Sequence, residues 1–405
     1  MKEGDFVEND YSFWNTYLNE TIKRIEALIL NKEKIYTDFH IHSDYSADGK
    51  QNLDQIIFRA QSLGLDIISI TDHDAIGIYN DLYRYMKDNE KVIPIIVPGI
   101  EFTVENKEYG SQCHILQLMI NPKDNELIEN VKHNEEALWR RIDIQFNRIS
   151  ENATLQFFIK KYNIKCSKED YVNYLKKFKR PIPEYSTLME YLMHSLSESN
   201  VTTWDIFYRL LSDNVQDECD ERKQMKANRY KILEERYKNN PDACNSTRFL
   251  HSMLAVKGVD DDYFQQYKSC GSLSVNNYNQ LKLEQLNKKY ITIFAHPSEE
   301  KLANIDSIMR LSNNISGMEL NRQTNYKDLQ QFYNKLYELN MIKVIGSDSH
   351  TPDSSWYDDM NFYIADKKDL VKFLKKVKGY IKQTWQILKI DIKYVKCLQV
   401  KNTLW

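Results

Sequence analysis

The chain has 405 residues, of which 42% are hydrophobic, so it can build a sizeable core and is longer than a single α/β barrel of about 250 residues. A net charge of −3 and a pI near 6.3 exclude a general electrostatic attraction to nucleic acid. The six cysteines are scattered without a Cys-x-x-Cys pair, which argues against a zinc–thiolate site and for reduced thiols. No signal peptide is recognisable, and no stretch reaches the roughly 18 uncharged residues of a membrane span, so we expect a cytoplasmic protein without membrane contact.

Apolar residues recur every three or four positions over residues 12–32, which predicts an amphipathic helix that packs on the outside of the adjoining domain. From residue 36, short apolar strands alternate with helical segments, a pattern typical of a parallel sheet with crossover helices. The expected strands cover residues 36–40, 66–70, 92–97, 112–119, 290–295, 317–320 and 342–346. The expected crossover helices cover residues 52–63, 76–88, 300–311 and 326–339.

This alternation breaks between residues 123 and 285, where the pattern indicates helices around 138–149, at 185–211 and at 222–238. The simplest interpretation is one α/β barrel that carries a large helical insertion. The resulting domain prediction is a helix at 1–34, a barrel at 35–122 and 286–365, an insertion that caps the substrate at 123–285, and a basic extension at 366–405.

Six of the nine histidines lie in five short clusters, each just after an apolar strand. The clusters are Asp38–His42 with Asp48, Thr71–Asp74, Gly99–Phe102 with His114, Ala295–Pro297, and Gly346–His350. Imidazole and carboxylate groups hold divalent cations at neutral pH, and metal ions held in this way serve phosphate-ester hydrolysis. In an α/β barrel the carboxyl ends of the strands meet at one rim, so we expect these side chains to converge there.

Each cluster also has an ordinary interpretation when it is taken alone. His40 and His42 could be a surface pair, Asp48 a turn residue, and His114 a satisfied core histidine. The acids beside His73 could cap a helix instead of orienting a metal ligand. Five clusters beside strands, taken together, favour the multi-metal interpretation.

The remaining clusters add a bridging carboxylate and a second chelating pair. Glu101 follows Pro-Gly and an apolar strand, where a carboxylate can bridge two cations. His296 ends an apolar run, and Pro297 restricts the direction of the chain after it. Asp348 and His350 repeat the i, i+2 spacing of the first histidine pair, which places both side chains on one side of an extended segment.

The segments DFHIHS with a later DG, ITDHD, GIEF with CHIL, and AHP with GSDSH together resemble the signature of the PHP (polymerase and histidinol phosphatase) superfamily. The resemblance covers residues 36–120 and 290–350 and implies a distorted seven-stranded (β/α) barrel with two to three divalent ions, such as Mn²⁺, Zn²⁺ or Fe²⁺. It implies a first metal at His40, His42, Glu101 and Asp348, a second at Glu101, His114 and His296, and a third at Asp48, His73 and His350. Among these, Glu101, Asp348 and His350 are the candidate catalytic residues.

Within the superfamily the chain is similar to bacterial phosphoesterases that act on nucleoside 3′,5′-bisphosphates and on the 5′ ends of short RNA. Residues 136–142, with Arg140 and Arg141, resemble the helix that opens the insertion in those enzymes, and residues 247–251, with Arg248, resemble its second helix. This chain has Arg-Phe-Leu-His where that branch usually has Arg-Pro-His. The resemblance implies that the three arginines bind substrate phosphate, whereas the ordinary alternative is a solvated helix surface.

Three functions compete: a phosphoesterase for nucleotides or nucleic-acid ends, an exo- or endonuclease for RNA or DNA within a larger assembly, and a non-enzymatic scaffold or sensor. Residues 367–401 carry eleven lysines against two aspartates, so this strip could follow a phosphate backbone or form a solvated helix. The expected substrate is a nucleotide or a short nucleic acid. A protein partner or a second copy could bind through the N-terminal helix, the insertion or the C-terminal extension.

Overall fold

The computed structural model divides the chain into two compact units, Met1–Asn134 with Gln280–Trp405, and Glu135–Asn279. Each unit has a buried apolar core of its own. The structure describes residues 11–46, 48–88, 94–104, 113–151, 153–203, 205–206, 231, 234–235, 281–296, 315–320, 338, 340–352, 356 and 359–382.

A seven-stranded sheet forms the centre of the first unit, with its strands side by side in chain order. The strands are β1 (Thr37–Ile41), β2 (Ile67–Ile70), β3 (Ile95–Val104), β4 (Cys113–Leu118), β5 (Ile291–Phe294), β6 (Gly317–Leu320) and β7 (Ile342–Ile345). Backbone hydrogen bonds join the end of β1 to the segment after β7: Asp348 N donates to His40 O at 2.9 Å, and His42 N donates to Ser349 O at 2.8 Å. The sheet is therefore a nearly closed barrel, which confirms the predicted distorted seven-stranded fold.

One strand departs from the expected parallel arrangement. β4 is antiparallel to both β3 and β5, so the prediction of an all-parallel sheet is wrong at this strand. The reason is the short connection, because only residues 105–112 separate β3 from β4, and a parallel crossover needs a dozen residues or more. As a result, the first residues of β4 lie beside the last residues of β3, with Thr103 opposite His114.

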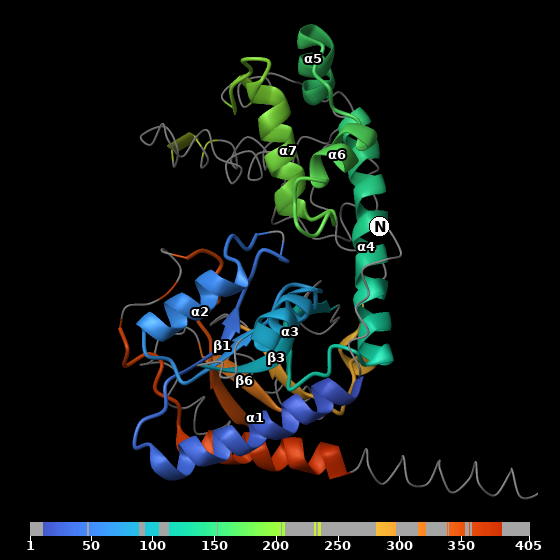
Figure 1. Ribbon diagram of the computed structural model, residues 1–405. Helices are drawn as coiled ribbons and strands as arrows, with labels where there is room; N and C mark the ends of the chain where they lie inside the picture. The colour runs from blue at the N-terminus through green and yellow to red at the C-terminus, as the bar shows by residue number, and fades with distance from the viewer. Residues whose placement is uncertain are drawn as a thin grey trace, which may run out of the picture. The chain divides into compact units, whose positions relative to one another are not determined.

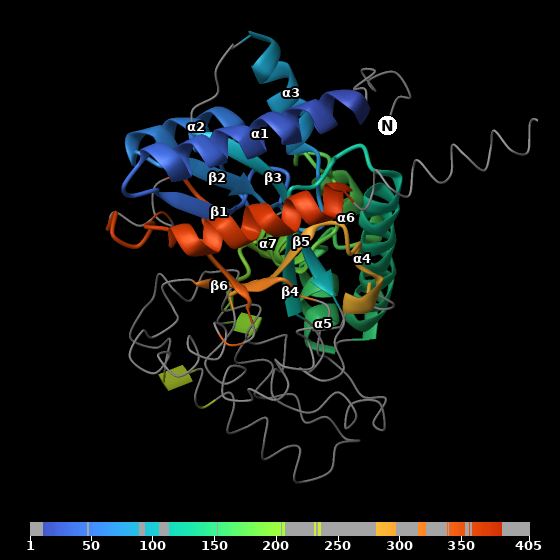
Figure 2. The same ribbon diagram turned by 90° about the horizontal axis from the view of Figure 1, so that it is seen from below.

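Helices cover the outside of the barrel. They include α1 (Tyr11–Asn31), α2 (Leu53–Ser62), α3 (Ile78–Asp88) and a helix over residues 367–382. Figures 1 and 2 show α1 and the 367–382 helix running side by side beneath the sheet. Their apolar residues share one buried cluster with the strands: Leu18, Ile22, Ile25, Leu370, Phe373, Leu374 and Val377. The prediction of an amphipathic N-terminal helix packed on the barrel is confirmed, and the helices expected at 300–311 and 326–339 fall almost wholly outside the described residues.

The described part of the second unit is largely helical. It contains the end of α4 (Asn125–Glu151), then α5 (Ala153–Tyr162), α6 (Lys168–Leu175) and α7 (Tyr185–Ser197). The helix expected at 185–211 is interrupted after Ser197, because Asn200 adopts a left-handed φ of 56° that an α-helix cannot continue through. Residues 203, 205 and 206 are helical again, and residues 207–211 lie outside the described residues. The helix expected at 222–238 lies almost entirely outside the described residues.

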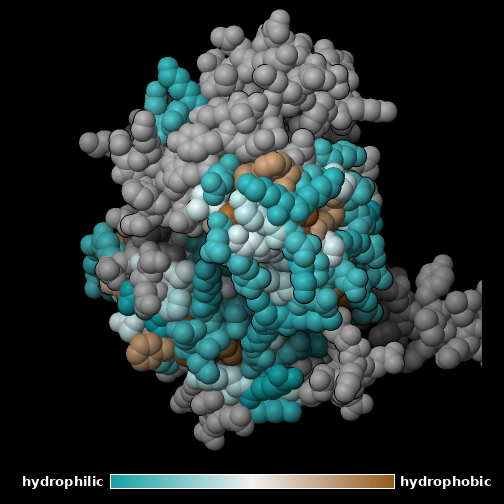
Figure 3. Space-filling model, turned by 90° about the horizontal axis from the view of Figure 1, so that it is seen from above, coloured by the Kyte–Doolittle hydropathy of each residue, from teal (hydrophilic) through white to brown (hydrophobic). Residues whose placement is uncertain are grey.

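The described surface is largely polar where Figure 3 displays it, with only small separate apolar patches. Among the described helices, none combines the length and the apolarity that crossing a lipid bilayer requires.

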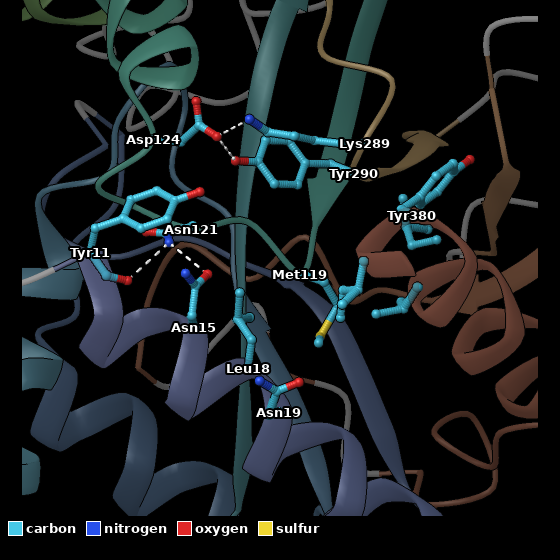
Figure 4. Close-up of a pocket in the computed structure, with 13 residues that line it drawn as sticks. Tyr11, Asn15, Leu18, Asn19, Met119, Asn121, Asp124, Lys289, Tyr290 and Tyr380 are labelled. Atoms are coloured by element: carbon cyan, nitrogen blue, oxygen red, sulfur yellow. Dashed lines mark hydrogen bonds and ion pairs between the residues drawn. The ribbon is translucent and has the colours of Figure 1, made fainter. Parts of the chain in front are cut away.

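A cavity of about 140 Å³ lies between α1, the 367–382 helix and the start of β5 (Figure 4). At its polar end the Tyr290 hydroxyl donates to Asp124 at 2.8 Å, and Lys289 forms an ion pair with the same carboxylate. Asn121 Nδ2 donates to Asn15 Oδ1 at 3.2 Å. These groups therefore satisfy one another at the polar end of the cavity.

Candidate metal centre

Glu101 lies at the centre of the site, with no measurable exposure to solvent. The expectation that it follows a strand is wrong, because β3 continues through it to Val104, where pairing with β4 extends the strand. The two carboxylate oxygens of Glu101 face five imidazoles at 3.0 to 3.2 Å: His40, His42, His73, His114 and His296. Burial alone would raise the pKa of this carboxyl, but the surrounding imidazoles hold it well below its usual range. Each oxygen of this carboxylate therefore faces a different set of imidazoles: Oε2 faces His40, His42 and His73, and Oε1 faces His114 and His296.

The first candidate ligand group consists of His40, His42, Glu101 and Asp348. His40 and His42 stand two residues apart at the end of β1, so their rings point the same way, and their Nε2 atoms are 2.9 Å apart. Asp348 Oδ1 lies 3.4 Å from His40 Nε2 and 3.2 Å from His42 Nε2. Two ring nitrogens this close cannot both point a hydrogen at the other, whereas a single cation would accept both lone pairs.

A second group consists of Asp48, His73 and His350, joined by His42. Asp48 Oδ2 lies 3.2 Å from His350 Nε2 and 3.7 Å from His73 Nε2. The other ring nitrogen of His350 lies 2.8 Å from the carbonyl oxygen of Asp348, which suits donation from Nδ1 and leaves the Nε2 lone pair free for a ligand. The three residues that the resemblance implied for the third metal, Asp48, His73 and His350, therefore lie close together, and His42 lies beside them.

The third group consists of His73, Glu101 and His114. His296 stands next to it, with its Nε2 3.1 Å from His114 Nδ1 and 3.1 Å from Glu101 Oε1. His114 reaches the site because β4 is antiparallel, which brings the start of that strand to the same rim as the end of β5. The structure thus places all nine predicted ligands around one point, while their role as metal ligands stays a prediction.

The site is closed on one side and open on the other. His40, His42 and Glu101 have no measurable exposure, whereas the side chains of Asp348 and Asp48 are 32% and 39% exposed. The side chains of His114 and His296 are exposed to a similar degree, at 31% and 30%, so they lie on the open side as well.

The sequence analysis did not identify two residues that contact the candidate metal ligands, Ser46 and Glu319. Ser46 Oγ lies 3.0 Å from His42 Nδ1 and donates to the buried Asp72 at 3.1 Å. Glu319 lies in β6, fully buried, with Oε1 3.0 Å from His40 Nδ1. An acid inside the short apolar strand Gly-Met-Glu-Leu was the signal that could have revealed Glu319.

Two of the three predicted phosphate-binding arginines lie among the described residues. Arg140 and Arg141 lie on α4 in the second unit, and Arg140 Nη1 is 3.5 Å from Glu136. Arg141 is largely buried, and its charge opposes the burial that raises the pKa of the Tyr171 hydroxyl. Arg248 lies outside the described residues, so phosphate binding by all three arginines stays a prediction.

Comparison with known proteins agrees with this architecture. The family model of the PHP domain matches residues 38–346. A protein of Bifidobacterium adolescentis, itself proposed to be a metal-dependent phosphoesterase, is similar in structure with a TM-score of 0.51 and 13% identity over 84% of this chain and 96% of its own. An amidohydrolase from Chromobacterium violaceum, crystallised with sulfate, gives a TM-score of 0.46 and 15% identity over 79% and 89% of the two chains. No curated protein matches the chain significantly.

Proposed function

Because the chain belongs to the PHP domain family, we propose that it is a metal-dependent phosphoesterase that hydrolyses phosphate esters of nucleotides or of nucleic-acid ends. The observation that carries this proposal is the convergence of six imidazoles and three carboxylates at one rim of the barrel. Within the described part of the chain, the ion pairs of Glu101, Asp348 and Asp48 are all formed with histidine. A carboxylate cluster that lacks a permanent cation of its own suits divalent metal ions.

Three cations account for the whole ligand set. The assignment is His40, His42, Glu101 and Asp348 for the first, Glu101, His114 and His296 for the second, and Asp48, His73 and His350 for the third. Mn²⁺, Zn²⁺ and Fe²⁺ all accept imidazole and carboxylate, so the donor set is compatible with each of them. When bound, such cations polarise phosphoryl oxygens and make water a stronger acid.

The protein's own residues hold this arrangement in place. Glu101 presents one oxygen to each of two candidate sites, which sets their separation. Asp348 and His350 come from one turn after β7 and connect the first candidate site with the third. This turn lies on the exposed side of the site, so both residues are accessible to a substrate phosphate. We assign them, with Glu101, the catalytic roles.

The lysines near the C-terminus favour the small-substrate form of this proposal over a nuclease that tracks a long strand. Four of them are engaged within the first unit: Lys367, Lys372, Lys376 and Lys378. They contact Ile29, Asp369, Ser316 and Glu26 respectively. These four lysines therefore make contacts within the first unit, three of them between the 367–382 helix and other segments of that unit.

A substrate panel with Mn²⁺ tests the proposal. It should contain a generic phosphodiester, nucleoside 3′,5′-bisphosphates, and labelled single-stranded RNA and DNA with defined ends. We expect phosphate release from the bisphosphates or from nucleic-acid ends. Progressive shortening of long strands would favour the nuclease alternative instead, and inactivity on every substrate together with less than one metal ion per chain would favour a scaffold or sensor.

A further inference from the structure

A buried acid lies directly behind the candidate metal centre. Glu319 belongs to β6 and has no exposed surface, yet no lysine or arginine pairs with it among the described residues. Its contacts are with two histidines of the candidate ligand set, on the side away from the cations. An ionised carboxylate in such a place is costly unless its oxygens receive strong hydrogen bonds.

Each oxygen of Glu319 meets one donor. Oε1 lies 3.0 Å from His40 Nδ1, and Oε2 accepts from the backbone N–H of His296 at 2.5 Å. The opposite nitrogen of His40, Nε2, is the one that faces Glu101 and Asp348. When Nε2 supplies a lone pair to a cation, Nδ1 must carry the proton, and Glu319 is its acceptor.

Both partners of Glu319 are therefore donors, and this requires a carboxylate. A glutamine at the same place would offer one oxygen and one NH₂ group, so one of the two N–H groups would face another donor. An amide could align His40 or the chain at His296, but not both. His296 has a left-handed φ of 25°, a conformation that a non-glycine residue adopts only when its surroundings hold it.

The neighbouring strand leaves room for this acid. A Cβ added at Gly346 would lie 2.1 Å from Glu319 Oε1 and 2.6 Å from His40 Cβ. No side chain fits there without moving one of these two residues. Gly346, the first residue of the Gly-Ser-Asp-Ser-His segment, thus leaves the space in which Glu319 and His40 contact each other.

We propose that Glu319 is a positioning residue of the metal centre, whose two oxygens align His40 and His296, ligands of two different cations. This inference rests on the proposed function, since it requires that cations bind. It extends the site by a residue from β6, the one strand that contributes no ligand to the set. It also couples the two cation sites through a single buried side chain on the side away from the substrate.

The test is metal binding by the full-length chain, stripped of metal and titrated with Mn²⁺ against a competing chelator. Glu319→Gln should weaken the tightest site by about 10- to 100-fold, the usual effect of losing a group that orients a ligand. Glu319→Asp keeps two acceptor oxygens and should recover part of the affinity. Gly346→Ala retains Glu319 but forces Glu319 or His40 to move, which disturbs the contact between them, and should cause a loss of the same order as Glu319→Gln.

Asp369→Asn is the matched control, because Asp369 is also a buried carboxylate but pairs with Lys343, away from the ligand groups. It should leave Mn²⁺ affinity unchanged. With Co²⁺ in place of Mn²⁺, the visible absorption should change in Glu319→Gln and stay as in the wild type in the control. Circular dichroism of the metal-free proteins establishes which variants fold.

The outcomes separate the two proposals. A wild-type chain that binds no Mn²⁺ would overturn the proposed function. A wild-type chain that binds, together with a folded Glu319→Gln variant of equal affinity and unchanged Co²⁺ spectrum, would overturn the role of Glu319. If Glu319→Gln does not fold, wild-type affinity in Gly346→Ala and Glu319→Asp overturns it equally, and reduced affinity in both supports it.

Discussion

The two ends of the barrel both bury carboxylates, but they satisfy them in different ways. At the end where β5 begins, Asp124 accepts a hydrogen bond from Tyr290 and pairs with Lys289, so the protein itself supplies the positive charge. At the other end, Glu101 is surrounded by five imidazoles and pairs with no lysine or arginine among the described residues. Imidazoles can be neutral or charged, so the charge of this end depends on what binds there.

This difference distinguishes a structural acid from a functional one. The Asp124 cluster is complete without a ligand, and a change there should affect stability alone. In the Glu101 cluster, imidazole nitrogens and carboxylate oxygens face one another around one point. A substitution of one of these residues should therefore affect metal content and turnover. Variants at the two ends of the barrel test this contrast.

The largest effect is expected for Glu101→Gln. The substitution removes a charge that two candidate cation sites share, so both sites should lose affinity together. Turnover should fall by more than the roughly 100-fold that is typical for loss of a supporting group. Phosphate release at saturating Mn²⁺, with metal content by elemental analysis, measures this, and full activity of the variant would overturn the ligand assignment.

His42→Ala should have nearly as large an effect. His42 Nε2 lies 3.2 Å from both Glu101 and Asp348, so its loss removes one arm of the first candidate site. We expect fewer metal ions per chain than in the wild type and strongly reduced turnover. His194→Ala is a suitable control, because that histidine lies on α7 and pairs with Glu198. Equal metal content in the His42 variant and the control would contradict the assignment.

Metal affinity should fall as the pH is lowered. Burial alone would lower the pKa of His42, but hydrogen bonds with Asp348 and Glu101 raise it to about 10 in the metal-free site. Its proton must therefore leave when a cation binds, and affinity should rise with pH by about tenfold per unit for each proton released at neutral pH. Calorimetry in buffers of different ionisation enthalpy measures the protons released, and release of none would refute this account.

The smallest effect on function is expected at the opposite end, for Asp124→Asn. The change weakens the contacts with Lys289 and Tyr290 and should lower the free energy of unfolding by about 1 to 2 kcal/mol. Denaturant unfolding of the metal-free protein measures this loss. Mn²⁺ affinity should be unchanged, and a large drop in affinity would show that the two ends are not independent.

Local patterns in the chain were sufficient to predict most of the barrel. The alternation of apolar strands and helices predicted a strand that overlaps each of β1 to β7, although β3 continues to Val104, seven residues beyond the predicted end at residue 97. The spacing of His40 and His42 placed both rings on one side of a strand, because side chains two residues apart share a face. These features depend on periodicity, which is a property of short segments.

Other features arose only when distant segments came together. The direction of β4 was not predictable from its residues, since a strand has the same side-chain period whichever way it runs. Ser46 carries no local signal of its role, and the acid in the apolar strand at Glu319 indicates a buried charge but not its partner, because each residue supports a histidine through a contact made only in the folded chain. Glu319 and His40 are 279 residues apart, and only closure of the sheet brings β6 within reach of that ring. A ligand's residue type can be predicted from its own segment, but the group that orients it is selected by tertiary packing.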